Sequence, residues 1–372
     1  MHDFRPLIIA STHRETAEAL SVTLVVPEAL RAAFRFRPGQ HLAFRAVLNG
    51  EELRRTYSIC SGPDDQHLTV TIKRVPGGRF SSWAAETLHP GMTIDAMPPA
   101  GRFVLAETPS EKTHILAFAA GAGITPIMAM AEHAMRRQPS SRFTLIYGNR
   151  DVDSIIFRER LENLKDSHLD RFALLHVLSR NEETDTPLLE GRITADKVSA
   201  FAGHIFDVRD IDQAFLCGPG TMIREVRNAL IALGMPRERV HHEFFAPAAG
   251  TQARTGTAET ARPGGTLAAP SPGNTPTAGQ QTDIVAIVDG KRHRFTARPG
   301  EVVVDAALRA GVRAPYACKG GMCSTCRARV VEGRVTMRVN YSLEPWEIEK
   351  GFVLTCQALA ETDRLVVDYD QM

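Results

Sequence analysis

Residues 314–326 read APYACKGGMCSTC, a run in which three cysteines are spaced C-x4-C-x2-C. A fourth cysteine follows after 29 intervening residues, in the segment VLTCQ. Gly320 and Gly321 have no Cβ, so the backbone there can wrap closely around a bound group and aim its N–H groups at it. The four thiolates expected to bind one inorganic group are those of Cys318, Cys323, Cys326 and Cys356.

This spacing is the plant-type ligand pattern of a [2Fe–2S] cluster. Structural zinc usually takes two C-x2-C-like pairs, whereas here the fourth cysteine stands alone. A redox pair made of Cys323 and Cys326 would leave the other two cysteines without a role. A disulfide staple is uncommon in a long chain without a secretion signal. The sequence therefore favours the iron–sulfur cluster, which carries one electron at a time.

The composition is that of a globular protein of two or three domains, with 372 residues, 43% of them hydrophobic and 23% charged. Lys and Arg number 44 against 43 Asp and Glu, so no bulk attraction to nucleic acid or to a membrane surface is indicated. Residues 1–20 lack the apolar core of a signal peptide. Glycines and a proline interrupt the apolar run 115–131, which predicts a buried strand and helix rather than a membrane span. We expect a cytoplasmic protein.

Residues 1–108 predict a small antiparallel β-barrel. The runs 20–26 and 67–73 are rich in β-branched residues or alternate in polarity, as half-buried strands do. Two motifs lie in this region, RRTYS at 54–58 and GGRFS at 77–81. Each is weak alone, because the first also fits a strand with an exposed arginine and the second fits a turn that opens a helix.

Residues 109–246 alternate strands with helices, which predicts a parallel sheet that binds nucleotide at the carboxyl ends of its strands. The apolar strand 113–119 runs into GAGITP at 121–126. Thr125 is expected to cap the next helix and Pro126 to occupy its first position. The glycine pair lacks the third glycine of the dinucleotide fingerprint, so it is a weak signal by itself.

Other strand ends carry polar residues. Arg150 and the pair Ser179-Arg180 follow two strands where an adenosine ribose is expected, and two guanidiniums there favour a 2′-phosphate. The sequence thus predicts NADPH rather than NADH. Cys217-Gly218 end a further strand, and a buried cysteine of purely structural character is the alternative for that position.

Together, and in this order, these motifs resemble the ferredoxin-NADP reductase superfamily. The resemblance implies that Arg55 pairs with flavin phosphates, that Tyr57 stacks on the isoalloxazine ring and that Ser58 lies near the nitrogen that receives hydride. It implies a phosphate site on the backbone N–H groups of residues 78–82. Residues 97–103 resemble the closing strand of the family's barrel.

The same resemblance assigns the nucleotide half of the site. It places the pyrophosphate over Gly121 to Thr125, the nicotinamide beside Cys217, and Glu243 and Phe245 against the flavin, with phenylalanine where tyrosine is common. Ser58, Cys217 and Glu243 are the expected catalytic residues. The expected cofactor-binding residues are Arg55, Thr56, Tyr57, Ser58, Gly78, Arg79, Phe80, Ser81, Gly121, Ala122, Gly123, Thr125, Arg150, Ser179, Arg180, Cys217, Gly218 and Phe245.

Residues 247–282 change to Ala, Gly, Thr, Pro and Gln, which predicts a flexible linker. Residues 283–372 are β-rich again and resemble the β-grasp fold of [2Fe–2S] ferredoxins. The chain is therefore expected to be multidomain, with a flavin barrel, an α/β nucleotide domain and a ferredoxin domain in that order.

The resemblance implies a reductase that passes electrons from NADPH through FAD and the cluster to an oxygenase. The element at 78–81 favours FAD over FMN. The segments 318–326 and 332–341 resemble the group of reductases that serve phenylacetyl-CoA 1,2-epoxidases in phenylacetate degradation. A reductase of a ring-hydroxylating oxygenase or of a hybrid-cluster protein is the alternative within the same chemistry. A redox-sensing module without fast turnover is an alternative of another kind.

Overall fold

The computed structural model describes residues 3–105, 112–180, 186–245, 267–268 and 281–371. The chain divides into two compact units. The larger unit spans residues 4–250, and the smaller spans residues 251–372 together with the first three residues. We describe each unit by itself.

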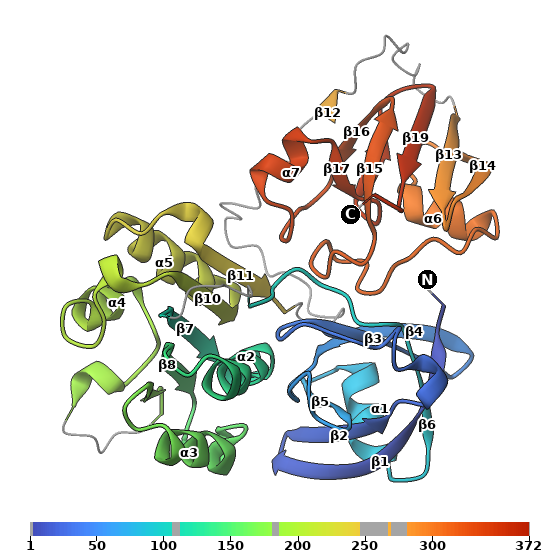
Figure 1. Cartoon of the computed structure of the whole chain (residues 1–372). Coiled ribbons are helices and arrows are strands. Elements are labelled where there is room, and N and C mark those ends of the chain that lie inside the picture. Colours follow the sequence, from blue (N-terminus) through green and yellow to red (C-terminus); the bar gives the residue numbers. More distant parts are fainter. Residues whose placement is uncertain (1–2, 106–111, 181–185, 246–266, 269–280, 372) are drawn as a thin grey trace. The chain divides into compact units, whose positions relative to one another are not determined.

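The first half of the larger unit is a six-stranded antiparallel sheet in the order β4-β3-β6-β1-β2-β5 (Figure 1). An isolated antiparallel bridge between Ile59 and Val70 joins the edge strands β4 and β5, so the sheet closes into the expected barrel. The strands are β1 (Arg5–Thr16), β2 (Ala19–Val25), β3 (His41–Leu48), β4 (Glu51–Ser58), β5 (Leu68–Lys73) and β6 (Thr93–Ala96), accompanied by helices η1 (Glu28–Leu30) and α1 (Arg79–Thr87).

One strand of the barrel differs from the expectation. Residues 97–103 are not a strand, apart from a bridge between Ala100 and His41. The strand that pairs with both β1 and β3 is β6, which ends immediately before this segment. Pro98 and Pro99 have no N–H group, so a hydrogen-bonded ladder cannot continue through them.

The second half of the larger unit is a parallel sheet in the order β11-β10-β7-β8-β9, as the alternating pattern predicted. Its strands are β7 (His114–Ala120), β8 (Arg142–Asn149), β9 (Phe172–Leu178), β10 (Gln213–Gly218) and β11 (Val240–Phe244). Its helices are η2 (Gly121–Gly123), α2 (Ile124–Arg137), η3 (Val152–Ser154), α3 (Arg158–Ser167), η4 (Pro187–Leu189), α4 (Ala195–Phe201), η5 (Val208–Asp210), α5 (Gly220–Ala232) and η6 (Arg237–Arg239).

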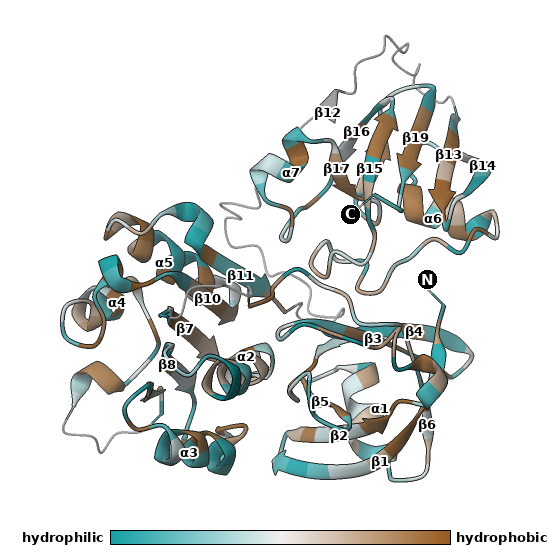
Figure 2. Ribbon diagram, in the orientation of Figure 1, coloured by the Kyte–Doolittle hydropathy of each residue, from teal (hydrophilic) through white to brown (hydrophobic). Residues whose placement is uncertain are grey.

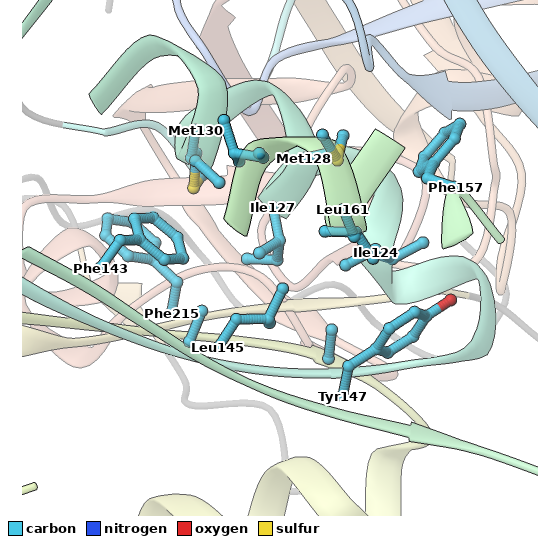
Figure 3. Packing of buried hydrophobic residues seen from close by; sticks show 14 of the residues in the cluster. Ile124, Ile127, Met128, Met130, Phe143, Leu145, Tyr147, Phe157, Leu161 and Phe215 are labelled. Atoms are coloured by element: carbon cyan, nitrogen blue, oxygen red, sulfur yellow. The ribbon is translucent and has the colours of Figure 1, made fainter. Parts of the chain in front are cut away.

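Helix α2 is buried almost all round and packs on this sheet. Figure 3 shows Ile124 and Ile127 of α2 facing Leu145 and Tyr147 of β8, and all four are fully buried. The apolar run 115–131 is therefore a strand followed by a buried helix, as expected. Among the described residues no helix has both the length and the hydropathy to cross a membrane.

The start of α2 corrects a second expectation. The helix begins at Ile124, so Thr125 lies in its first turn and is not the N-cap. Its hydroxyl donates to the Ala122 carbonyl at 3.0 Å. The N-cap is Gly123, without a side-chain hydrogen bond, and Pro126 is the third helical residue. The 3-10 turn η2 supplies the entry to the helix, so a capping side chain is not needed.

The two lobes of the larger unit are joined by a clamp of charged hydrogen bonds. Arg160 of α3 donates to both carboxylate oxygens of Glu132 in α2, each at 2.6 Å. It also donates to the Cys60 carbonyl of the barrel at 2.7 Å. The Glu132 side chain is only 7% exposed, and burial with these hydrogen bonds makes the pair stronger than a surface salt bridge.

The smaller unit has a five-stranded sheet in the order β14-β13-β19-β15-β17, in which only β13 and β19 run parallel to each other. A second sheet has the order β12-β16-β18. Apolar residues dominate strands β13 and β19 (Figure 2). The elements are β12 (Leu267–Ala268), β13 (Thr282–Val288), β14 (Lys291–Ala297), α6 (Val303–Arg309), β15 (Arg327–Glu332), β16 (Arg334–Met337), α7 (Pro345–Glu349), β17 (Phe352–Leu354), β18 (Ala358–Ala360) and β19 (Arg364–Asp368).

The predicted linker 247–282 lies outside the described residues, except for residues 267–268 and 281–282. Strand β13 begins at Thr282, one residue before the predicted start of the last domain. Helix α6 buries Val303, Val304 and Ala307 in the core of this unit. One helix packed on a mixed sheet is the expected β-grasp arrangement.

Candidate functional site

Three residues expected to be catalytic lie at one place in the larger unit. Ser58 ends strand β4 of the barrel, and its hydroxyl lies 3.4 Å from a carboxylate oxygen of Glu243. Glu243 is opposite Cys217 in the register of the parallel strands β10 and β11. Since parallel strands present their carboxyl ends at one edge, the sheet brings Cys217 and Glu243 together, and the barrel adds Ser58.

A fourth residue at this place, His41, was not predicted. It begins β3, is 3% exposed, and its Nδ1 lies 3.8 Å from the other carboxylate oxygen of Glu243. Gly101 lies against the ring: a Cβ on it would come within 2.8 Å of Nδ1, and its φ is +109°. His41 follows the turn Arg37-Pro38-Gly39, and a histidine right after a turn at a strand start was the available signal.

Cys217 itself is fully buried. Burial, and then the negative charge of Glu243, raise the pKa of its thiol well above the ordinary value. The thiol therefore stays protonated and neutral, and it is not suited to act as a nucleophile. This environment fits a buried strand-end cysteine, whereas direct contact with a nicotinamide would require the side chains that cover Cys217 to move.

The glycine loop after β7 is packed directly on Cys217. A Cβ on Gly123 would lie 2.1 Å from the Cys217 carbonyl oxygen, so no other residue fits there. Gly121 has a φ of +53° and accepts a hydrogen bond at its carbonyl from the buried Tyr147 hydroxyl at 3.0 Å. The loop is therefore fixed by Tyr147 of β8 and by the end of β10.

The two predicted arginines also lie at this edge but in different surroundings. Arg150 follows β8 and pairs with Glu18 of the barrel at 2.7 Å. Lys73, at the end of β5, lies 3.8 Å from the same carboxylate oxygen, and its pKa is lowered by burial. Arg180 follows β9 beside Ser179, and both side chains are exposed.

The predicted flavin residues on β4 lie on the barrel surface that adjoins this edge. Tyr57 is half-buried between Phe44 and Phe80, with ring centroids 6.1 Å and 5.7 Å away. Burial raises its pKa, so the phenol stays neutral. Arg55 is half-buried on the same face of the strand, and its Nη1 donates to the Arg54 carbonyl at 2.7 Å. Thr56 is half-buried on the opposite face.

The side chain of Phe80 lies inside the barrel. Its side chain is 2% exposed and packs on Tyr57 and Trp83, so it belongs to the barrel core. Only its backbone N–H remains for a ligand. Arg79 is exposed and pairs with Glu51 at 2.7 Å, so its side chain likewise points to a neighbouring strand.

The start of α1 keeps the geometry of an anion site. Gly78 is the N-cap, without a side-chain hydrogen bond. The Ser81 hydroxyl donates to the Gly78 carbonyl at 3.2 Å and accepts from the Val75 N–H at 3.3 Å. A Cβ on Gly78 would lie 2.4 Å from that hydroxyl, so glycine is required. The first-turn N–H groups have no intrahelical partner and suit a phosphate.

The four cysteines of the smaller unit form two adjacent pairs. Cys318 and Cys323 lie within hydrogen-bonding reach of each other, as do Cys326 and Cys356. The neighbouring Cys323 thiol, together with backbone N–H groups, lowers the pKa of Cys318. In the part of the chain that the structure describes, no three His, Cys, Asp or Glu side chains converge on a single metal position.

Two separate thiolate pairs fit a cluster of two irons, with one pair for each iron, and do not fit one tetrahedral zinc. The backbone supports this fit. Lys319, Gly321 and Ser324 have left-handed φ angles of +51°, +73° and +54°. These turns direct N–H groups inward, and the Gly320 N–H donates to the Cys318 sulfur at 3.3 Å.

Comparison with known families matches each part of the chain. Residues 9–105 match the oxidoreductase FAD-binding domain, residues 118–228 the oxidoreductase NAD-binding domain, and residues 286–361 the 2Fe-2S iron-sulfur cluster binding domain. The chain is 41% identical over its whole length to one of the subunits of 1,2-phenylacetyl-CoA epoxidase from Escherichia coli, and it covers 99% of that protein. It belongs to this family of flavin and iron–sulfur reductases.

Other relatives also match almost the whole length of this chain. The ferredoxin reductase component of 3-ketosteroid-9-alpha-monooxygenase from Rhodococcus rhodochrous is 33% identical over 98% of this chain and 96% of its own. The solved phthalate dioxygenase reductase has a TM-score of 0.58 at 23% identity and covers 98% of each chain, which supports the fold. The protein is thus an NAD(P)H-dependent oxidoreductase with FAD-, NAD(P)- and [2Fe–2S]-binding domains.

Proposed function

We propose that this reductase takes electrons from NADPH and delivers them, through FAD and the [2Fe–2S] cluster, to the oxygenase of a phenylacetyl-CoA epoxidase system. The observation that carries the proposal is the 41% identity with the Escherichia coli epoxidase protein over the full length of both chains. The residues of the site fit the cofactors, and FAD supplies the step from a two-electron donor to one-electron acceptors when it is bound.

The protein's own residues would bind, orient and exclude water. Tyr57, supported by Phe44 and Phe80, offers a flat surface for the flavin ring. The helix start at Gly78 offers N–H groups for its phosphates. Ser58 and Glu243 lie where the barrel meets the nucleotide sheet, and there they would hold a proton near the reacting ring.

Cys217, with its neutral and fully buried thiol, would lie beneath the nicotinamide site. The glycine loop at 121–123 would bind the pyrophosphate. Phe245 follows β11 and is 37% exposed, so it is available to cover the flavin while nicotinamide is absent. The domains proposed are 1–108 for flavin, 109–246 for nucleotide, 247–282 as linker and 283–372 for the cluster.

The preference for NADPH rests mainly on Arg180. Its exposed guanidinium beside Ser179 would meet the 2′-phosphate, whereas Arg150 already pairs with Glu18. Arg150 would contribute only if a bound nucleotide displaced that carboxylate. The proposal therefore assigns nucleotide selectivity to Arg180 first.

The test mixes this protein with the purified oxygenase subunits of a phenylacetyl-CoA epoxidase, NADPH and phenylacetyl-CoA. We expect NADPH oxidation that rises with substrate and forms oxygenated product in proportion. Rapid reduction of the flavin and cluster without transfer to that oxygenase would contradict the partner and leave a different oxygenase, such as a steroid or ring-hydroxylating one, to be tested. No reduction within seconds would contradict a reductase and favour a sensor.

A further inference from the structure

The side chain after the fourth cysteine links that cysteine to the loop that carries the other three. The Gln357 side-chain nitrogen lies 2.8 Å from the Lys319 carbonyl oxygen and 3.6 Å from the Cys356 sulfur. Its two N–H groups can serve both acceptors at once. Gln357 is 8% exposed, so water does not compete for these hydrogen bonds.

The orientation of this amide follows from its surroundings. A carbonyl oxygen only accepts hydrogen bonds, so the Gln357 atom that faces Lys319 has to be the nitrogen. The backbone of Gln357 is also held, because its N–H donates to the Leu354 carbonyl at 2.8 Å and its carbonyl accepts from the Arg338 N–H at 3.0 Å. A buried side chain on a fixed backbone keeps one conformation.

Gln357 also packs on the cysteine loop. A Cβ on Gly321 would come within 3.2 Å of the Gln357 side chain, so the loop passes closely over the amide. Lys319 has a left-handed φ of +51°, which costs free energy in a residue with a side chain. The hydrogen bond to its carbonyl therefore stabilises a backbone conformation that the loop does not favour by itself.

We propose that Gln357 is a positioning residue that ties the fourth cysteine to the loop carrying the other three and raises the reduction potential of the cluster. One added electron increases the negative charge on the sulfurs. An N–H group that donates to Cys356 stabilises the reduced form more than the oxidised form. This inference rests on the [2Fe–2S] cluster of the proposed function but not on the identity of the electron acceptor.

The test compares Gln357→Leu with the wild-type protein in a redox titration of the cluster, followed by electron paramagnetic resonance. Leucine keeps the volume and removes both donors. We expect a lower midpoint potential and faster loss of iron in air. Gln371→Leu is the matched control, because Gln371 is exposed and bonds only to Arg329 and Asp368 in the described structure. An unchanged potential in Gln357→Leu at full iron content would overturn the inference.

If Gln357→Leu fails to assemble a cluster, the wild-type protein provides the measurement. Pulsed resonance on the reduced protein, labelled with nitrogen-15 in glutamine side chains, should detect one coupled amide nitrogen. Its absence would overturn the inference. Reduction of the flavin by NADPH is recorded on the same samples, so a chain that is not a reductase is distinguished from one in which only Gln357 was assigned wrongly.

Discussion

The cluster site and the dinucleotide site of this protein are built in opposite ways. Three of four cysteines come from nine consecutive residues, and the fourth is brought in by β17 and the turn after it. The proposed dinucleotide site instead joins the ends of β4, β7, β10 and β11, from two sheets in two lobes. A local motif thus defines the first site, whereas the second exists only when both lobes are packed together.

This difference has a functional consequence. The hydrophobic core of the cluster unit is formed by residues between Ile284 and Tyr369 alone, so we expect damage to this core to leave the entry of electrons unchanged. The proposed dinucleotide site would depend on interlobe contacts, such as the hydrogen bond of Ser58 to Glu243 and the clamp at Arg160. Variants in one region should leave the other region's reaction intact.

The largest expected effect comes from Cys356→Ser. Removing one of four thiolates should cost most of the iron and nearly all outward electron transfer, while the reduction of the flavin by NADPH stays near the wild-type rate. Iron analysis measures the iron content, and stopped-flow absorbance measures the rates of flavin reduction and of outward electron transfer. Full iron content would contradict the assignment of the four ligands, and slow flavin reduction would contradict the separation of the two regions.

Gly123→Ala should have the next largest effect. Its Cβ would lie 2.1 Å from the Cys217 carbonyl, so the backbone of the glycine loop has to shift. We expect a rise of the Michaelis constant for NADPH of about tenfold or more, equivalent to roughly 1.4 kcal/mol, with iron content unchanged. Gly62→Ala is the control, since a Cβ there meets only ordinary contacts at 3.4 Å. Equal constants in both variants would show that the loop does not hold the nucleotide.

Arg160→Met tests the clamp between the lobes. It leaves the buried Glu132 carboxylate without its guanidinium and the Cys60 carbonyl without its donor, which should cost the larger unit about 2–3 kcal/mol of unfolding free energy. Thermal unfolding of the whole chain with its cofactors measures this. In the control Arg158→Met, which breaks an exposed pair with Glu162, the loss should stay below about 0.5 kcal/mol.

Glu243→Gln tests the function of the contact between the barrel and the parallel sheet. The amide keeps a partner for Ser58 but removes the charge beside Cys217 and His41. We expect flavin reduction to slow by roughly tenfold, a modest loss for a proton-holding group, and the Cys217 thiol to titrate at lower pH, because the charge of Glu243 helps to raise its pKa. Thiol titration by ultraviolet absorbance is the readout that a merely structural role would not change.

Arg180→Ala should have the smallest effect. We expect the Michaelis constant for NADPH to rise a few-fold, and that for NADH to stay constant, because only NADPH has the 2′-phosphate. Steady-state kinetics with both nucleotides measures the difference. Equal changes of the Michaelis constants for NADPH and NADH would show that Arg180 does not select between the two nucleotides. Arg150 would then be the next residue to test.

Much of this architecture follows from local sequence. The glycine and proline turns and the period of the apolar residues predicted the antiparallel barrel and the parallel sheet, because these signals act over a few residues. The fold of the last domain was implied by its resemblance to ferredoxins. The predictions that were wrong concern segments where local signals compete. Two prolines ended pairing in residues 97–103, and the 3-10 turn η2 replaced Thr125 as the entry to α2.

The sequence by itself determined the four cysteines and the strand that ends at Cys217, since each is a matter of spacing along the chain, and the family resemblance supplied the order of the three domains and the place of Glu243. Only the tertiary structure decided that Ser58 and His41 meet Glu243, that Phe80 is core and that Gln357 bonds to a cysteine sulfur. These contacts join residues that are far apart in the sequence or depend on side-chain orientation. Strand register and close packing fix such contacts, and neither leaves a local pattern in the sequence.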